Sequence, residues 1–554
     1  MSQEKEFQSS VSSVLEDIEK AEADKGDGLW IGRVTDKVLA EFPDRPLYTC
    51  AAGISPSGIV HFGNFRDVMT SYAVMRELQL RGKQARLLFS WDNYDRFRKV
   101  PAGVDPSFSR YIGYPLTDVP DPTGEYESYA RRFEVEFEDA VKELGIDLDY
   151  RYQTKEYKSG RYADQIAFVL QNRAKAADIQ LQFKTDKGNQ EKGIDPETYR
   201  QTYFPVTVYS RFSGTDKTQV LSYDGGTTLT YRCLVTGKEE QIDFKQTPVV
   251  KLPWKLDWPM RWREEGVNFE PGGKDHATPG GSYDVSATVA RELFGFTPPV
   301  FQGYQFVGIQ GMGGKMSGSK GNAVSPATLL EIYEPSLLKW LYMRRSPTQS
   351  FNLAFDSEVN RQYDEFDREI AAYQRGEASP AKQKILNFSG VDKNQAAPPL
   401  SFKQTVALGQ ITQWQPVKLR ELAEKSGIGC SEDSVARRAP KALAWLTNYN
   451  ADEIIKLRDE PAVDYIAALD ETRRGHVRKL HAFLSGDVSS IADLDSELYA
   501  IPKNASLDDK ALKAAQRAFF KDVYMLLIGR ETGPRLSTFL WAVDRAVVLK
   551  LLAS

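Results

Sequence analysis

The sequence has few cysteines, and their placement excludes two kinds of covalent or metal support. Its 554 residues include only three, Cys50, Cys233 and Cys430, which are far apart and odd in number. A disulfide framework is therefore not expected, and the pattern predicts three free thiols. Cys233 is the only cysteine between positions 51 and 429, without the paired spacing of a zinc ribbon. We expect no structural zinc and no protein-bound metal site.

The sequence also lacks long apolar runs and an excess of positive charge. No stretch approaches the roughly 20 apolar residues that a membrane helix needs. The first 30 residues are polar and acidic, unlike an export signal. We therefore expect a cytoplasmic protein without a membrane partner. The formal net charge is −4, so no global positive field indicates DNA, and any contact with RNA must be local.

What remains is the composition of a large globular protein. Hydrophobic residues make up 41% of the chain and charged residues 27%, values typical of folded domains rather than disordered or fibrous chains. A chain of 554 residues is too long for one compact core. We expect two to four domains of ordinary size.

The first ordered segment follows a strand, helix and strand pattern. Leu47 to Gly53 is typical of a short buried strand, and a turn-rich stretch follows it. Apolar residues then recur at spacings of three and four, which predicts an amphipathic helix with Gly82 as its stop. Arg86 to Trp91 is a second apolar run. The order predicts an α/β fold with a doubly wound, Rossmann-like parallel sheet and the loop at its carboxyl edge.

Later segments change the pattern three times. Residues 100 to about 250 mix Gly, Pro and Tyr with both periodicities, and we interpret them as an insertion. Alternation from Val300 to Ile309 predicts a strand, and Ser325-Pro326 opens a helix after a glycine-rich loop. Arg375 to Phe402 has the composition of a connection. Beyond it the pattern is almost wholly helical.

The first candidate site is the turn-rich stretch before the helix. Its residues of interest are Pro56, Ser57, Gly58, His61, Gly63 and Asn64. A helix start offers unpaired amides and a partial positive charge to a phosphate. His61 and Asn64 are three apart, so both side chains can face one ligand and stabilise charge that develops on it. The alternative is an ordinary helix start with a structural histidine.

The second candidate site is the glycine-rich loop from Gly313 to Gly321. Its residues of interest are Lys315, Met316, Ser317, Ser319 and Lys320. Two lysines and two hydroxyls after a strand suit a triphosphate, because the lysines neutralise the charge of the leaving pyrophosphate. The alternative is a solvated basic loop without a ligand.

These two segments resemble the HIGH and KMSKS motifs of class I aminoacyl-tRNA synthetases. They stand here as HFGN (61–64) and KMSGSK (315–320), with Asn64 in place of the second histidine and Gly318 in place of the second lysine. Lys320 is then the candidate substitute. The same departures, with the stretches at 90–101, 258–262, 269–284 and 533–536, resemble the class I lysyl-tRNA synthetases. The resemblance implies that ATP with Mg²⁺, lysine and tRNA(Lys) are the substrates.

A lysine pocket requires a carboxylate for the ammonium group and an aromatic wall along the methylene groups. The candidates for the carboxylate are Asp92, Asp95, Asp275 and Asp284, which lie in the quoted stretches. The candidates for the wall or for a hydrogen bond are Trp262, His276 and Tyr283. Because a buried, unpaired ammonium is very unfavourable, at least one acid must point inward. Spacing does not decide which one.

The resemblance also implies a domain order. We expect a catalytic domain at 1–345 with a connective insertion at about 100–250, a connecting segment at 346–400, and an α-helical anticodon-binding domain at 401–554, in a monomer. Arg437, Arg438 and the basic run 473–481 are candidates for RNA contact, or equally for a solvated helix face. Three alternatives remain: a glutamyl-type synthetase, a non-catalytic lysine- or tRNA-binding paralogue, and a small-molecule nucleotidylyltransferase.

Overall fold

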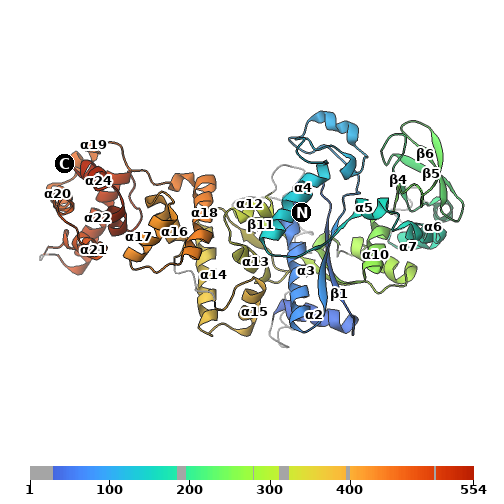
Figure 1. Ribbon diagram of the computed structural model, residues 1–554, viewed down its shortest axis with the longest axis horizontal. Coiled ribbons are helices and arrows are strands. Elements are labelled where there is room, and N and C mark those ends of the chain that lie inside the picture. Colours follow the sequence, from blue (N-terminus) through green and yellow to red (C-terminus); the bar gives the residue numbers. More distant parts are fainter. Residues whose placement is uncertain are drawn as a thin grey trace, which may run out of the picture. The chain divides into compact units, whose positions relative to one another are not determined.

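The computed structural model describes residues 29–183, 195–276, 278, 280–310, 324–394, 400–504 and 507–553. The chain divides into two compact units (Figure 1). Unit 1 comprises Met1–Leu330, Pro335–Leu353 and Ala378–Val391. Unit 2 comprises Glu331–Glu334, Ala354–Glu377 and Asp392–Ser554.

Unit 1 is built on a parallel sheet that, within the described ranges, has five strands in the order β10-β9-β1-β2-β3. The strands are β1 (Tyr48–Ile54), β2 (Ala85–Trp91), β3 (Asp149–Tyr152), β9 (Val267–Gly273) and β10 (Val300–Tyr304). β1 and β2 pair in register from Tyr48 with Ala85 to Ile54 with Trp91. The predicted α/β class and parallel sheet are confirmed.

Helix α3 (Phe62–Leu80) connects β1 to β2 and packs against both, as Figure 1 shows. Its apolar residues at the predicted spacing, Phe65, Val68, Met69, Tyr72 and Ala73, are all buried. The helix ends just before Gly82, whose φ of 75° is a left-handed conformation that glycine adopts without strain. The β1–α3–β2 unit was therefore predicted correctly from local pattern.

Strand β3 lies within the range that we interpreted as an insertion, yet it extends the main sheet. It pairs with β2, Leu88 opposite Asp149 and Trp91 opposite Tyr152. All four of its residues, DYRY, are only half-buried, so the strand carries no apolar run by which the sequence would reveal it. The small sheets β5-β6-β7 and β4-β8 follow it along the chain.

The alternating segment Val300–Ile309 forms two strands in different sheets instead of the single strand that we predicted. β10 joins the main sheet, and β11 (Val307–Ile309) pairs with β12 (Phe351–Leu353). Between them the carbonyl of Gln305 accepts a hydrogen bond of 2.8 Å from buried Arg66. The two residues are 239 positions apart in the sequence. The alternation of apolar residues within one strand therefore cannot reveal this contact.

The other elements of unit 1 surround the sheet and the insertion. The helices are α2 (Trp30–Glu41), α4 (Tyr129–Glu143), α5 (Gln153–Lys158), α6 (Ala163–Gln171), α7 (Arg173–Gln182), α9 (Pro196–Thr202), α10 (Trp254–Glu265), α11 (Ser282–Thr288), α12 (Pro326–Leu330), α13 (Pro335–Met343) and α15 (Pro380–Phe388). The short turns of helix are η1 (Pro106–Tyr111), η2 (Leu116–Asp118), η3 (Lys274–His276) and η4 (Val289–Leu293). The small strands are β4 (Thr207–Val208), β5 (Thr218–Tyr223), β6 (Thr228–Cys233), β7 (Glu239–Asp243) and β8 (Val250–Lys251).

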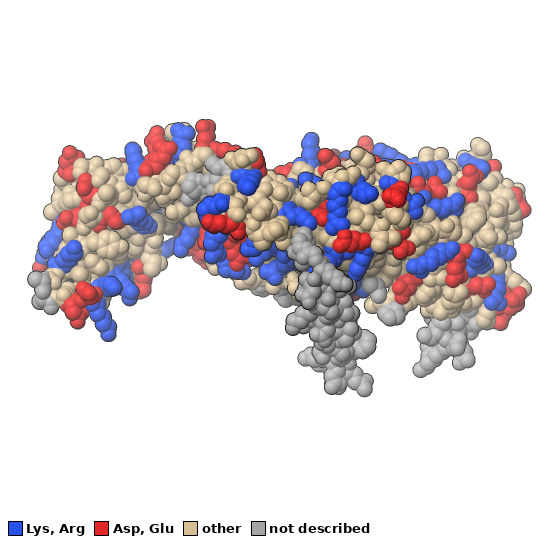
Figure 2. Space-filling model, turned by 90° about the horizontal axis from the view of Figure 1, so that it is seen from below, with Lys and Arg blue, Asp and Glu red and all other residues tan. Residues whose placement is uncertain are grey.

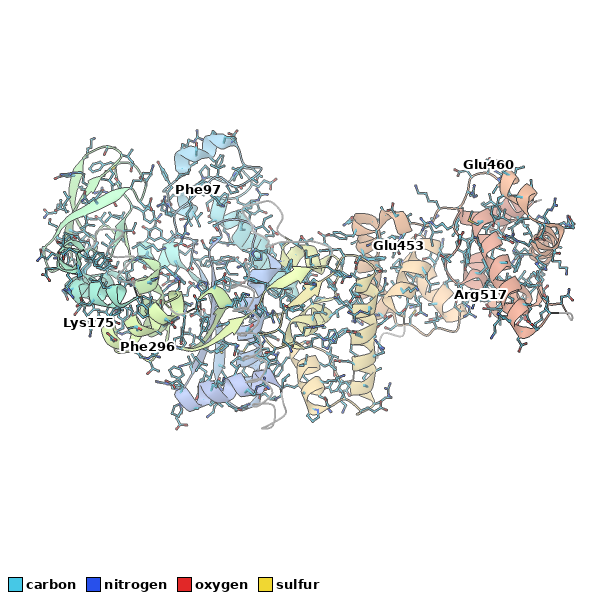
Figure 3. The ribbon with its side chains drawn as sticks, turned by 180° about the vertical axis from the view of Figure 1, so that it is seen from behind. Phe97, Lys175, Phe296, Glu453, Glu460 and Arg517 are labelled. Atoms are coloured by element: carbon cyan, nitrogen blue, oxygen red, sulfur yellow. The ribbon has the colours of Figure 1, made fainter. Side chains whose placement is uncertain are left out.

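Two clusters of buried apolar side chains pack segments of unit 1 that lie outside the main sheet. Phe97 packs edge-to-face on Tyr129, with ring centroids 5.2 Å apart, in one of them. Phe296 packs against the other, which joins α6 and α7 to the small sheets, and Figure 3 labels it together with Phe97 and with Lys175 of α7. Helix α15 lies within the segment 375–402, whose composition predicts a connection.

The elements of regular structure that the described residues of unit 2 form are all helices. The elements are α14 (Glu358–Gln374), α16 (Phe402–Ile411), α17 (Pro416–Lys425), α18 (Glu432–Tyr449), η6 (Ala451–Glu453), α19 (Val463–Ala468), α20 (Glu471–Ser485), α21 (Ile491–Ala500), α22 (Asp509–Ile528), α23 (Leu536–Ala542) and α24 (Arg545–Leu552). The predicted helical C-terminal region is confirmed. On the face drawn in Figure 2, basic and acidic side chains are interspersed over each unit.

None of the helices described is both long enough and apolar enough to cross a membrane. All three cysteines lie in described segments and are free thiols, as predicted.

Candidate active site

The carboxyl ends of β1, β2, β9 and β10 border a cavity of about 130 Å³. The strand order reverses between β1 and β9, and open α/β sheets bind ligands at such a switch point. The residues that line the cavity include Asn64, Asp67, Asp92, Trp258, Glu270, His276 and Tyr304.

Glu270 is the buried acid of β9, and two tryptophans of α10 hold it. The indole nitrogen of Trp258 donates to Oε1 at 3.0 Å, and that of Trp262 donates to Oε2 at 2.6 Å. Burial raises the pKa of Glu270 to about 7. Its carboxylate forms no ion pair with a described residue. Neutral donors thus orient the group but leave its negative charge uncompensated.

Asp67 is a second buried acid of the cavity, one turn into α3 from Asn64. The backbone N–H of Gly53 donates to Asp67 Oδ2 at 3.3 Å, and the hydroxyl of Tyr304 donates a further hydrogen bond. Burial, followed by the charge of Glu270, raises the pKa of Asp67 well above its usual range. Asp67 also has no cationic partner among the described side chains. The cavity therefore holds two carboxyl groups that favour a cationic ligand.

The charge of Asp92, by contrast, is already matched. Arg261 donates to Asp92 Oδ1 and to the Ser90 hydroxyl, each at 2.7 Å, and also pairs with Asp257 at 3.0 Å. Asp95 is paired with Lys251 outside the cavity. Asp92 thus lines the cavity as half of an ion pair, and Asp95 does not line it.

His61 is the N-cap residue of α3, at the carboxyl edge of the sheet. Its Nδ1 accepts from the N–H of Gly63 at 3.1 Å, so Nε2 carries the proton of the neutral ring. A Cβ at position 63 would lie 2.9 Å from the ring, which explains the glycine. Pro56 and Gly58 are buried in the preceding turn, and Ser57 is exposed.

The second candidate site falls in residues 311–323, so Lys315, Met316, Ser317, Ser319 and Lys320 lie outside the described residues. Val324, the first described residue after this stretch, accepts a hydrogen bond of 2.9 Å from the N–H of Phe62. Phe62 directly follows His61. The chain therefore re-enters the described structure beside the first candidate site, although the two are distant in sequence.

Comparison with known proteins finds a matching family and relatives that cover nearly the whole chain. Residues 28–392 match the family "tRNA synthetases class I (K)". A lysine–tRNA ligase of Streptomyces coelicolor is 38% identical, over 94% of this chain and 98% of that protein. The chain belongs to the class I lysyl-tRNA synthetases. Lysine–tRNA ligases of Treponema pallidum and Pyrococcus horikoshii are 33% and 32% identical over 95% and 94% of this chain.

A lysyl-tRNA synthetase has to bind the methylene groups of lysine, and aromatic side chains lie at and beside the cavity. Trp262 is fully buried and does not line the cavity, but its indole N–H donates to Glu270, which does. His276 lines the cavity beside Trp258, with ring centroids 6.0 Å apart, and burial lowers its pKa, so the ring is neutral near pH 7. Apolar and aromatic faces of this kind suit the methylene groups of lysine.

Besides Asp95 and Trp262, three further predicted pocket residues do not line the cavity. Asp275 is exposed on η3. Tyr283 stacks on Phe301 and donates its hydroxyl to the carbonyl of Pro299 at 2.9 Å. Asp284 accepts from the N–H of Gly280 at 3.1 Å. Their roles in the synthetase stay predictions.

Sequence reasoning missed the two acids that have no cationic partner. Glu270 stands in the quoted stretch 269–284, where an acid inside a strand of buried residues was the available signal. Asp67 follows Asn64 at a spacing of three, which places both on one face of a helix. Trp258, Arg261 and Tyr304 were also missed, and only Trp258 and Arg261 lie in a quoted stretch.

Arg437 and Arg438, two candidates for RNA contact, form ion pairs within unit 2. Arg438 is 1% exposed and donates to Glu334 at 2.7 Å and to Asp367. Arg437 is partly exposed and pairs with Glu334 and Asp433. The buried guanidinium of Arg438 does not reach solvent, so its predicted contact with RNA is wrong.

Proposed function

We propose that this protein ligates lysine to tRNA(Lys) in two steps. The carboxylate of lysine attacks the α-phosphate of ATP, so that lysyl-adenylate forms and pyrophosphate leaves. The 3′-terminal ribose hydroxyl of the tRNA then takes the lysyl group, and AMP leaves. The observation that carries the proposal is a cavity at the switch point with two buried carboxyl groups, Asp67 and Glu270, neither of which forms an ion pair with a described side chain.

Lysine brings two ammonium groups, and the cavity has one acid for each. Glu270 lies among the tryptophans, whose faces suit the aliphatic chain, so we assign the side-chain ammonium to Glu270. Asp67 lies one turn from Asn64 at the helix start, close to where the reacting carboxylate meets the phosphate. We assign the α-ammonium to Asp67.

The start of α3 supplies the groups for the α-phosphate. With Nδ1 accepting from Gly63, the neutral ring of His61 carries its proton on Nε2, and Asn64 places a carboxamide beside the cavity. The phosphate gains negative charge in the transition state, and fixed donors stabilise it without reorganisation. Mg²⁺ would be held chiefly by the phosphates and water. Catalysis is by positioning and charge, with no side-chain nucleophile.

The glutamyl alternative requires a cation for the side-chain carboxylate of glutamate. Among the described residues, Arg261 is the guanidinium or ammonium side chain that lines the cavity, and Asp92 and Asp257 already neutralise it. A carboxylate ligand would therefore meet uncompensated acids, which is unfavourable. A small-molecule nucleotidylyltransferase would not need a helical region of the size of unit 2.

Charging of bulk tRNA with lysine or with glutamate tests the proposal. We expect ATP-dependent charging with lysine and none with glutamate. Charging with glutamate alone would overturn the assignment. Pyrophosphate exchange, measured with tRNA present, separates an enzyme from a non-catalytic paralogue, because only the enzyme forms the adenylate.

Lys315→Ala and Lys320→Ala test the second motif. We expect each to lower the rate of lysine activation more than the affinity for ATP, because both lysines act on the leaving pyrophosphate. Rapid-quench measurement of adenylate formation separates the two effects. An unchanged rate in Lys320→Ala would show that Lys320 has not replaced the lysine missing at Gly318.

We further propose that the enzyme acts as a cytoplasmic monomer, without a DNA or membrane partner and without structural zinc. In the described segments no three His, Cys, Asp or Glu side chains gather as metal ligands. Light scattering on the purified protein tests the oligomeric state. Elemental analysis of the same sample tests the metal content.

A further inference from the structure

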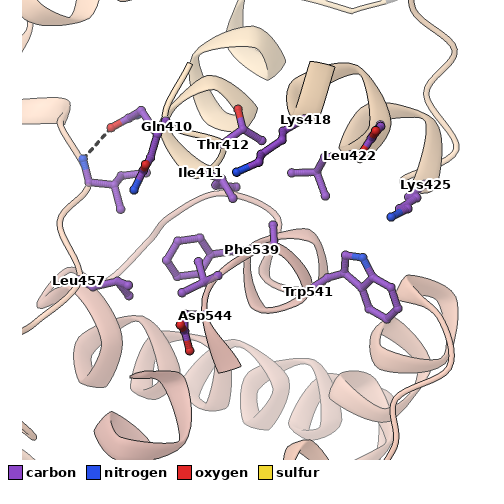
Figure 4. A pocket seen from close by; sticks show the side chains of 15 residues that line it. Gln410, Ile411, Thr412, Lys418, Leu422, Lys425, Leu457, Phe539, Trp541 and Asp544 are labelled. Carbon is purple, nitrogen blue, oxygen red and sulfur yellow. Dashed lines mark hydrogen bonds between the residues drawn. The ribbon is translucent and has the colours of Figure 1, made fainter. Parts of the chain in front are cut away.

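A second, smaller cavity lies behind Glu270, lined by residues of β1, β2, β9 and α10, and has a volume of about 30 Å³. Four residues border both this rear cavity and the cavity at the strand ends: Ser90, Trp258, Arg261 and Glu270. Figure 4 shows a larger cavity of about 660 Å³ in unit 2, where the lining acids Glu421 and Asp544 are exposed. The rear cavity differs because a buried acid and a buried base border one small space.

Arg261 is the buried base of this space, with an exposed fraction of 8%. Its charge lowers the pKa of Glu270 against the larger effect of burial, so the two groups interact electrostatically. No hydrogen bond or ion pair joins them in the described structure. An arginine beside a buried carboxylate normally pairs with it through both terminal nitrogens. Other groups therefore hold the guanidinium away from Glu270.

Two acids and one hydroxyl hold the guanidinium of Arg261. One terminal nitrogen donates to Asp92 Oδ1 and to the Ser90 hydroxyl, each at 2.7 Å. The other terminal nitrogen pairs at 3.0 Å with Oδ2 of Asp257, one turn earlier on α10. Arg261 thus has two carboxylates, although one is enough to neutralise it. The second carboxylate, Asp257, borders neither cavity.

Asp257 is itself fixed in the interior of unit 1. It is 2% exposed, and its Oδ1 accepts a hydrogen bond from the hydroxyl of buried Tyr157. That hydroxyl in turn accepts from the N–H of Leu252 at 3.3 Å. The carboxylate therefore has a neutral donor on one oxygen and the guanidinium on the other, so that its charge is directed to Arg261.

The rear cavity gives Arg261 room to move. Its Nε has no hydrogen-bond partner in the described parts of the chain, nor has Oε1 of Gln153, which borders the same cavity. A volume of about 30 Å³ equals the share of one water molecule in the liquid. A guanidinium that Asp257 no longer holds can therefore turn into this space, which Glu270 also borders.

We propose that Asp257 is a positioning residue that keeps Glu270 available to a cationic side chain, and this inference rests on the proposed function. Asp257 holds Arg261 beside Asp92, so that no internal base neutralises Glu270. Without the charge of Asp257, two acids, Asp92 and Glu270, share one guanidinium. The ammonium of lysine then meets a carboxylate that is already paired, and selection of a cation weakens.

Asp257→Asn tests the proposal, because it removes the charge while the amide oxygen can still accept from Tyr157. In ATP–pyrophosphate exchange with tRNA present, we expect KM for lysine to rise about tenfold at pH 8, as for the loss of one charge-assisted hydrogen bond. We expect kcat and KM for ATP to stay within about twofold of wild type, since only the binding of lysine is weakened.

The pH profile separates this role from a merely structural one. Arg261 paired with Glu270 favours the ionised carboxylate, so the acid limb of kcat/KM for lysine should move about one unit to lower pH. The other acidic and basic side chains that border the two cavities are unchanged in the variant: Asp67, Asp92, Arg151, Glu265 and His276. A structural defect would lower activity at every pH without moving the limb.

A second variant reverses the effect if Arg261 is its cause. In Asp257→Asn/Arg261→Gln no internal base can pair with Glu270, so KM for lysine should return to within about threefold of wild type. A structural role predicts the opposite, since the double variant removes more buried contacts. Tyr157→Phe applies the test without a change of charge, because it only loosens Asp257, and should raise KM for lysine about threefold.

Glu77→Gln is the matched control. Glu77 is also 2% exposed and pairs with an arginine of its own helix region, Arg81, at 2.9 Å, but it borders neither cavity. We expect an unchanged KM for lysine and an unmoved acid limb. If Asp257→Asn and Tyr157→Phe match this control, the role of Asp257 is overturned while the proposed function stands. If wild type shows no exchange with lysine, the proposed function itself fails.

Discussion

At the scale of single residues, the site is defined by which acidic side chains already form an ion pair with a basic side chain and which do not. Asp92 and Asp95 each face a basic side chain, Arg261 and Lys251. Glu270 is held only by indole N–H groups, which fix its position without neutralising it. A buried, unmatched carboxylate is unfavourable for folding. Such a group is retained where a cationic ligand later matches it.

Glu270→Gln keeps the shape of the side chain and removes its charge. Because breaking one partner of a buried ion pair costs about 3 kcal/mol or more, we expect kcat/KM for lysine to fall at least about a hundredfold, with KM for ATP within about twofold. Asp275→Asn is the matched control, since Asp275 is exposed outside the cavity. A larger loss in Asp275→Asn than in Glu270→Gln would assign the ammonium to Asp275.

The pH dependence of lysine use follows from the same carboxyl group. Burial raises the pKa of Glu270 to about 7, and only the ionised form pairs with an ammonium. The ionised fraction is lost as pH falls through this value, so kcat/KM for lysine should fall about tenfold per unit below pH 7. Asp67, whose pKa burial also raises, can only steepen the fall. A flat profile between pH 5.5 and 7.5 would contradict the assignment.

At the scale of elements, α3 connects the site to the break between β10 and β11. Arg66 is 2% exposed and donates to three carbonyl oxygens, Gln305 and Ser346 at 2.8 Å and Gln349 at 2.7 Å. Burial lowers its pKa to about 10, still well above neutrality. One guanidinium thus satisfies the backbone where the strand changes sheet.

Arg66→Met should destabilise this region by about 3 kcal/mol, because three carbonyl oxygens lose the buried donor that they share. Native-state hydrogen exchange of the amides of β10 and β11 measures the loss where it occurs. Arg76→Met, on the same helix but half-buried, is the control and should cost no more than about 1 kcal/mol. Equal protection factors in the two variants would contradict this role for Arg66.

The connections between β4 and β5 and between β6 and β7 each contain a turn of the same form. Ser210–Gly214 and Cys233–Gly237 each close with a hydrogen bond from the glycine N–H to the first carbonyl, at 2.7 and 2.8 Å, and both glycines have φ near 70°. The side chains at the first and fourth positions meet. Cys233 donates to the Ser213 hydroxyl at 3.4 Å. Zinc knuckles place four thiolates at this spacing.

The triple variant S210C/S213C/T236C should therefore bind one zinc ion. Four thiolates around zinc lie about 3.8 Å apart when each bond is about 2.3 Å, which is close to the present contact. Cobalt titration should give the absorption of a tetrahedral thiolate site with one ion per chain, and wild type should give none. Absence of that band in the triple variant would show that the turns do not have the required geometry.

At the scale of the whole molecule, the two units are not continuous in sequence. Unit 2 takes Glu331–Glu334 and Ala354–Glu377 from between segments of unit 1. Within unit 2, Arg438 is buried against Glu334, Asp367 and the carbonyl of Leu400. The predicted domain limits at 345, 400 and 401 stay a prediction.

Fragments test where the helical region can be separated. Fragment 401–554 removes all three partners of Arg438, whereas 354–554 keeps Asp367 and Leu400. Because 401–554 loses these bonds and the packing of Arg438 on the Tyr363 ring, we expect urea unfolding to show 354–554 more stable by about 3 kcal/mol. Arg438→Met should destabilise 354–554 and leave 401–554 unchanged within about 1 kcal/mol. Equal losses in both fragments would contradict the explanation.

The sequence by itself determined the β1–α3–β2 unit, the position of His61 and Asn64 at a helix start, and the helical character of the C-terminal region. These follow from periodicity and short connections, which act between near neighbours. Only the tertiary structure decided which acids are available to lysine. Asp92 and Arg261 are 169 residues apart, and Lys251 and Asp95 are 156 apart. Charge matching depends on distance through space, which spacing along the chain does not give, so Glu270 and Asp67 emerged only from the fold.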